Sequence, residues 1–224
     1  MKNYFKYAFG EIILVVIGIL IAMYIKGKYT ESQEQKHIER TTIQVIKDLR
    51  ADTTQLNAIL KTIEPREEIF LSILADTMDI DDFKNCNECA YLISSLQPFE
   101  PVQSGYLILK DLETDLISSQ DSLIHDTKLF YSMSIPMFTL LVDMLKEDVS
   151  SNLKDWRDTQ PWYADWVQGK STDELIAYMA NDPSYRNKVA NYYLLLYKNY
   201  LRALRNYNSE ASKLADRWEV ELNK

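Results

Sequence analysis

The residues with the clearest chemical potential are Cys86 and Cys89, the two cysteines of the chain. Their C-x-x-C spacing suits a local disulfide, a redox pair or half of a zinc site. A zinc site needs four ligands, and the two histidines, His37 and His125, lie far away in sequence. A thioredoxin-like pair needs a strand followed by a helix, which the flanking residues do not predict. We therefore expect no metal and no cofactor here, and either a Cys86–Cys89 disulfide in an oxidising compartment or reduced structural thiols in a reducing one.

Acidic side chains are the next candidates for chemistry. Asp79, Asp81 and Asp82 resemble a calcium loop only in acidity, because the required glycine and distal glutamate are missing, so a solvated turn and helix cap is expected. Glu67-Glu68 is a second carboxylate pair in polar surroundings, without the apolar pocket that would raise a carboxyl pKa for acid–base catalysis. The chain also has no Gly-rich phosphate loop, H-E-x-x-H or G-x-S-x-G motif. The sequence therefore predicts no catalytic residue and a protein that is not an enzyme.

Glu11 stands at the start of the most apolar stretch of the chain, residues 12–25, which read IILVVIGILIAMYI. Residues 7–25, rising 1.5 Å each, reach about 28 Å as a helix, just enough for a hydrocarbon core of roughly 30 Å. We therefore predict a short N-terminal segment 1–6 and a transmembrane helix 7–25, with the lipid bilayer as a partner. A cleaved signal peptide fits less well, because Ala22-Met23-Tyr24 makes a poor cleavage site. A buried core helix is the other alternative.

Within this predicted span, two features could serve contacts between helices. Glu11 either lies at headgroup level in the first helical turn, or is a buried carboxylate that pairs with a partner or carries protons. Gly18 and Ala22 form a small-xxx-small step that would let another helix approach closely.

Aromatic side chains are concentrated in residues 155–170. One interpretation is a clamp that fixes a loop to the rest of the protein; the other is a surface that binds a partner, a ligand or lipid headgroups. The candidate residues are Trp156, Trp162, Tyr163 and Trp166.

The elements that position most of these candidates form a predicted acidic, helical soluble domain over 26–224. The formal net charge of −8 and the lack of a clustered basic face argue against a nucleic-acid partner. Apolar residues recur at alternating steps of three and four between 38 and 63, with Asp52 interrupting the seam and Thr53 as its possible substitute. Further helices are expected at 67–77, 90–96, 104–117, 121–154 and from Pro183 almost to the C-terminus. The fold class is therefore all-α: a transmembrane helix followed by an antiparallel helical bundle with long first, middle and last helices.

The inward faces of these helices are also predicted from spacing. For the short helices we expect Ile69, Phe70, Ile73, Leu74, Leu107, Ile108, Leu112 and Leu116. For the middle helix, kinked at Pro136, we expect Leu123, Ile124, Phe130, Met133, Met137, Leu141, Met144 and Leu145. For the last helix we expect Val189, Tyr193, Leu196, Tyr200, Ala203, Tyr207, Ala211, Leu214, Trp218 and Leu222.

Two segments resemble a family of uncharacterised single-pass membrane proteins that is common in Bacteroidota, especially flavobacteria. They are KYAFGEIILVVIGILIA at 6–22, and Phe99-Glu100 followed by SGYLILKD at 104–111. The resemblance implies a membrane location and a helical fold, and it carries no activity or site residue. The N-terminus is shorter and less basic than the family pattern, which leaves the membrane orientation open.

These patterns predict a protein of the bacterial inner membrane that acts as a non-enzymatic adaptor or accessory subunit. Its partners would be further copies of itself or other membrane-protein subunits. A sensor or ligand-binding bundle and an ion- or proton-coupled subunit using Glu11 are the alternatives. The Lys and Arg count mildly favours a cytoplasmic domain, whereas the C-x-x-C and the family resemblance favour the periplasm, which we expect.

Overall fold

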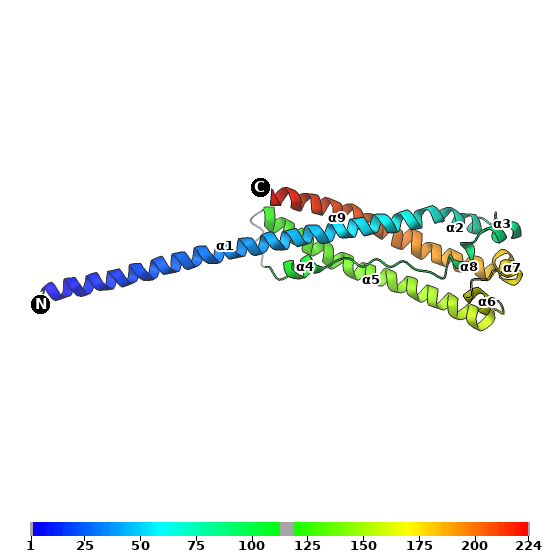
Figure 1. The fold of residues 1–224 in the computed structure, drawn as a ribbon, viewed down its shortest axis with the longest axis horizontal. Helices are drawn as coiled ribbons and strands as arrows, with labels where there is room; N and C mark the ends of the chain where they lie inside the picture. Colours follow the sequence, from blue (N-terminus) through cyan, green and yellow to red (C-terminus); the bar gives the residue numbers. More distant parts are fainter. Residues whose placement is uncertain (1, 113–118, 224) are drawn as a thin grey trace.

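The computed structural model describes residues 2–112 and 119–223, without the side chains of residues 2–13, 34, 119 and 120. Within these ranges the chain forms helices and no strand, so the predicted all-α class is confirmed. The molecule is elongated, with a helical bundle at one end and a single projecting helix at the other (Figure 1).

The projecting helix is the first half of α1, Lys2–Ile63, which is one continuous helix of 62 residues. From Leu14 to Gln33 every side chain is exposed, whereas the second half buries a seam that includes Val45, Leu49 and Leu56. Asp52 lies in this seam at 0% exposure, so the expectation that Thr53 takes its place was wrong. Pro65 follows in the 3₁₀ turn η1, Glu64–Arg66, and ends the helix because it lacks a backbone N–H.

Two further rods complete the bundle. The middle one is α5, Ser119–Thr159, which runs in the same direction as α1. The last is formed without interruption by α8 (Pro183–Tyr193), η3 (Leu194–Tyr200) and α9 (Leu201–Leu222), and it runs back antiparallel to α1 (Figure 1). The short α4, Ser104–Leu109, packs against both α1 and α5. The predicted long first, middle and last helices are therefore present, but the antiparallel arrangement holds only for the last of them, because the non-helical segment before α4 returns the chain to the end of the bundle where α1 enters it.

Short elements cover the end of the bundle that lies farthest from the N-terminus. They are α2 (Glu67–Leu74), α3 (Ile80–Asn85), η2 (Cys89–Tyr91), α6 (Tyr163–Val167) and α7 (Asp173–Asn181). At the start of α3, Asp79 and Asp82 accept hydrogen bonds from each other's backbone N–H groups at 2.9 and 3.0 Å, which is a capping box. This acidic stretch therefore has a local structural role at a helix start.

Residues 92–103, the return segment, run back along the bundle without helical structure from Gln97 to Gln103. The prediction of a helix over 90–96 was wrong, because only the single turn η2 is helical there. Tyrosines of the last rod hold this region by its backbone. Tyr185 donates to the Cys89 carbonyl (2.9 Å), Tyr192 to Ser95, and Tyr200 to Gln97 (3.2 Å), while Tyr200 also accepts from the Phe99 N–H (2.7 Å). These bonds replace those that a helix would have made within itself.

A π-helical stretch, η3, keeps the tyrosines on one side of the last rod. Tyr185 and Tyr192 are seven residues apart, Tyr192 and Tyr200 eight, and Tyr200 and Tyr207 seven. The wider π turn absorbs the additional residue. The seam prediction therefore failed at Tyr193, which is replaced inside by Tyr192, and at Leu222, which is 39% exposed. It held at Tyr200 and Tyr207.

The outward side of α5 differs from the prediction. Leu123, Ile124 and Leu145 are buried as expected, but three methionines placed inward by spacing are exposed: Met133 (66%), Met137 (39%) and Met144 (39%). In α4, Leu107 and Ile108 are likewise exposed, and the helix ends at Leu109 rather than near residue 117. Leu116, also expected to be buried, lies outside the described residues. Apolar spacing defined a helix in both cases but did not determine which side faces the core.

Within the described residues, the helix that is long and apolar enough to cross a membrane is α5, over Asp121–Thr159, with 28% of its most apolar stretch buried. Length and composition alone support that assignment, and the inward side of α5 belongs to the bundle core. The span predicted at 7–25 includes residues 7–13, whose side chains lie outside the described part. It therefore stays a prediction.

Candidate functional site

The exposed half of α1 contains the residues predicted to contact another membrane helix. A Cβ atom added at Gly18 would meet no atom within 4 Å, and Ala22 is exposed, so the side of α1 that holds both is open. Glu11 belongs to α1, but its side chain is outside the described residues. The structure thus leaves the Gly18–Ala22 step accessible.

The four aromatic candidates lie together near the far end of the bundle, and two of them are buried. Trp156 and Trp162 are 1% and 3% exposed and meet edge to face at 5.4 Å between ring centroids. The Trp156 indole donates to the Tyr178 hydroxyl at 3.1 Å. These two rings fix the end of α5 to α7 and are not available to a partner, which corrects the prediction of an accessible surface for them.

Tyr163 and Trp166 keep partial exposure at the same end. The Trp166 indole donates to the Ala90 carbonyl at 2.9 Å, and the ring lies 5.7 Å from that of Tyr91. These contacts tie α6 to η2. The surface that the four aromatic residues can offer is therefore confined to Tyr163 and Trp166.

Cys86 and Cys89 form a disulfide beside this aromatic end, with their Cα atoms 5.4 Å apart. Cys89 is fully buried, and its carbonyl accepts the Tyr185 hydroxyl. The bridge therefore closes the turn between α3 and η2 against the last rod.

The chemically most unusual feature lies in the middle of the bundle and was not predicted. We call it the acid–tyrosine cluster: Asp48, Asp52, Tyr131 and Tyr207. The two carboxylates are 2% and 0% exposed and lie one helical turn apart on α1. Neither has an ion pair with a lysine or arginine among the described residues. Burial of carboxylates without a cation is rare, because desolvation disfavours the charged form.

Hydrogen-bond donors, rather than cations, stabilise the two buried carboxylates. Asp52 accepts the Val102 N–H at 3.0 Å and the Tyr207 hydroxyl at 2.6 Å. Asp48 accepts the Gly105 N–H at 2.6 Å and the Gln44 side chain at 2.7 Å. Two carboxylates of α1 thus hold the junction between the return segment and α4 through its backbone.

Gly105 is required at this junction. A Cβ atom there would lie 2.6 Å from the backbone nitrogen of Val45, closer than real carbon contacts allow. The absence of a side chain lets α4 approach the α1 backbone and brings its N–H to Asp48.

Burial also changes the acid–base behaviour of the cluster. Desolvation raises the pKa of Asp52 from 3.8 to about 6, against the opposing effect of the Tyr207 and Val102 hydrogen bonds. Burial and the nearby negative charge of Asp52 likewise raise the pKa of Tyr207, so this hydroxyl stays a donor. The cluster can therefore take up a proton at mildly acidic pH.

Tyr131 is the least satisfied member of the cluster. Its side chain is 0% exposed, and its hydroxyl has no hydrogen-bond partner among the described residues. Its ring stacks on that of Tyr106 of α4 at 4.9 Å. Tyr131 thus contributes packing, and burial together with the nearby charges of Asp52 and Asp48 raises the pKa of its hydroxyl.

A hollow of about 420 Å³ lies on the side of α5 that faces the return segment. Its apolar lining includes Leu96 and Leu153, and three cations surround it: Lys146, Lys154 and Arg157. Lys146 lies 3.8 Å from Asp143 and Arg157 pairs with Asp158 at 2.8 Å, so aspartates offset part of this positive charge.

Some of these features could have been found from the sequence, and others not. An aspartate inside an apolar seam, as at Asp52, was a usable signal of a buried polar role. Asp48 and Tyr131 gave no such signal, because Gly105 and Tyr106, which they contact, belong to α4 and are distant in sequence. No protein-family model, curated protein or solved structure matches this chain.

Proposed function

We propose that the protein is a single-pass, membrane-anchored, non-enzymatic adaptor or accessory subunit that acts through protein–protein contacts. The observation that carries the proposal is the continuity of α1. One helix contains an exposed apolar run from Leu14 to Ile25 and, further along, the buried seam from Val45 to Ile63. A water-exposed run of this kind is unfavourable unless lipid or protein covers it.

The same continuity supports a mechanical role. Because α1 has no break between Ile25 and the core, tilt or rotation of the anchor would pass directly to the bundle. Arg50 of α1 pairs with Glu219 of α9 at 2.9 Å, which couples the last rod to this motion. Such a unit suits a subunit that positions a partner in or near the membrane.

The Cys86–Cys89 disulfide favours placement of the domain outside the cytoplasm, because disulfides persist in oxidising compartments. The resemblance of residues 6–22 to the family common in Bacteroidota supports an inner-membrane location. We therefore propose a periplasmic domain. A reporter fused after Lys224 and read for periplasmic against cytoplasmic activity tests this orientation.

The adaptor role is tested by purification from native membranes after mild crosslinking. A stoichiometric partner or an oligomer is expected. Leu20→Arg, in the middle of the predicted span, should release the protein from membranes, while Lys28→Arg should not. A protein that sediments with membranes as a clean monomer would contradict the adaptor role, and one that is soluble without substitution would contradict the anchor.

A ligand-binding bundle is the second candidate, favoured by the hollow with Lys146, Lys154 and Arg157. Its chemistry suits an anionic amphiphile, with an apolar chain on Leu153 and a negative group near the cations. A thermal-shift series with fatty acids of increasing length tests it. No shift, or an equal shift in Lys154→Gln, would remove this candidate.

A further inference from the structure

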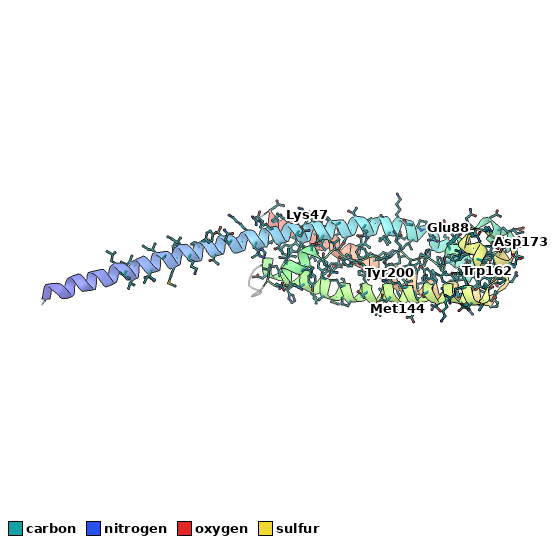
Figure 2. The ribbon with its side chains drawn as sticks, turned by 60° about the horizontal axis from the view of Figure 1, so that its bottom comes forward. Lys47, Glu88, Met144, Trp162, Asp173 and Tyr200 are labelled. Atoms are coloured by element: carbon teal, nitrogen blue, oxygen red, sulfur yellow. A yellow bond between two sulfur atoms is a disulfide. The ribbon has the colours of Figure 1, made fainter. Side chains whose placement is uncertain are left out.

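The outer face of α5 carries an apolar strip that the bundle does not cover, which we call the methionine stripe. Its members are Leu129 (50% exposed), Met133 (66%), Met137 (39%), Leu140 (61%) and Met144 (39%). The steps of four, four, three and four keep them on one side of the helix. Figure 2 shows Met144 at the outer edge of the bundle, whereas Tyr200 lies between the helices.

The stripe is free of charge along most of its length. The other exposed residues on this face between Leu129 and Leu140 are Ser132, Pro136 and Thr139, all uncharged. The first charge after them is Asp143, and Lys146 lies 3.8 Å from it on the same helix. For a chain in which 26% of residues are charged, an exposed uncharged face of this length is unusual for a solvated helix, and contiguous exposed apolar patches mark interaction sites.

The bilayer is a poor candidate for covering the stripe. If the apolar run ends at Ile25, the first buried residue of the bundle, Thr41, lies about 24 Å further along α1, at 1.5 Å per residue. The bundle then begins well above the lipid headgroups. This step rests on the membrane anchor of the proposed function.

We propose that the methionine stripe docks a second copy of this chain, with the two α5 helices parallel and related by a two-fold axis along the membrane normal. Copies anchored in one membrane present the stripe at the same height and in the same direction. A two-fold pair then places each stripe residue near its own equivalent. Because these residues are uncharged, no like charges meet between Leu129 and Leu140.

The size of the stripe fits this occupant. Its five side chains expose on the order of 500 Å² in each copy, so that a pair buries about 1,000 Å², near the lower limit of specific interfaces. Confinement of both copies to one membrane raises their effective concentration and compensates for a small interface. Flexible methionine side chains also pack well against copies of themselves.

The test uses the full chain in membranes, with single cysteines at Met133 and Leu140, which lie seven residues apart on the stripe. Both Met133→Cys and Leu140→Cys should give a disulfide-linked dimer on mild oxidation, because a parallel pair brings equivalent positions together. Val220→Cys, at 62% exposure on α9, is the matched control and should give at least tenfold less dimer. Adding Leu140→Glu to Met133→Cys should remove most of the crosslink while the circular dichroism spectrum stays unchanged.

Equal dimer yields from Met133→Cys and Val220→Cys would overturn the proposal, as would a crosslink that persists with Leu140→Glu. Adducts of Met133→Cys with a different protein would also overturn it. Membrane fractionation of the same samples distinguishes failure of the stripe dimer from failure of the membrane anchor. A membrane-bound chain without the Met133 crosslink contradicts only the stripe, whereas a soluble chain that still forms it contradicts only the anchor.

Discussion

The outer face of α5 and the inner face of the last rod are both built from large side chains at helical spacing, yet one is exposed and the other buried. The inner face has tyrosines, four of which bond through their hydroxyls to the backbone of Cys89, Ser95 and Gln97 or to Asp52. The outer face has methionines and leucines, whose side chains have no hydrogen-bond donor that needs a partner. Buried tyrosines need a polar partner, so their surroundings must be specific. Methionine imposes no such demand and can remain at a surface where a partner covers it.

The comparison predicts that substitutions at the inner contacts destabilise the fold and that substitutions on the methionine stripe do not. The largest effect is expected at Gly105. Gly105→Ala places a methyl group 2.6 Å from the Val45 backbone nitrogen and disturbs the bond to Asp48, so the free energy of unfolding should fall by about 4 kcal/mol. Urea unfolding followed by circular dichroism measures it.

The matched control is Gly27→Ala, in the exposed part of α1, where an added Cβ meets no atom within 4 Å. It should leave stability unchanged or raise it by up to about 1 kcal/mol, because alanine favours helix. Equal effects of the two substitutions would show that α4 is not held closely against α1.

The second prediction concerns pH. Because the pKa of Asp52 is raised to about 6, the folded chain binds more protons than the unfolded chain between pH 3.8 and about 6. The free energy of unfolding should therefore fall as the pH rises through this window, by about 3 kcal/mol for this group. Asp52→Asn should remove this part of the pH dependence and be up to about 3 kcal/mol more stable than the native chain at pH 7. Urea unfolding at several pH values between 4 and 7 measures it, and parallel curves for the two proteins would contradict the raised pKa.

The third prediction tests the tyrosine side of the same bond. Tyr207→Phe removes the hydroxyl that donates to Asp52 at 2.6 Å, so a buried carboxylate loses one of its two donors and stability should fall by about 2 kcal/mol at pH 7. The loss should shrink as the pH falls below about 6, where Asp52 of the folded chain becomes protonated. Tyr29→Phe, at 65% exposure, is the control and should change stability by less than about 0.5 kcal/mol.

The smallest effect on folding is expected on the methionine stripe. Met133→Gln replaces an exposed side chain by one of similar length, so unfolding of dilute, detergent-solubilised protein should change by less than about 0.5 kcal/mol. Scanning calorimetry at low protein concentration measures it. A loss comparable to that of Tyr207→Phe would mean that the stripe supports the fold of a single chain, and the contrast between the two faces would disappear.

The sequence by itself determined the helical class, the three long rods and most of their buried positions. Regular spacing of apolar residues is a local property that survives in any helical packing, so the seams of α1 and the last rod were predictable. The apolar run at 12–25 is local in the same sense, and its membrane role remains a prediction.

Only the tertiary structure decided which side of α5 faces inward, where the return segment leaves helical form, and what holds Asp48 and Asp52. Each outcome depends on a partner that is distant in sequence. The Ser95 and Gln97 carbonyls bond to tyrosines about a hundred residues later, Asp52 to Tyr207, and Asp48 to a glycine that lets α4 approach closely. The spacing of apolar residues along one helix indicates that the helix has an apolar face. The polar groups and close contacts supplied by other segments determine what that face meets.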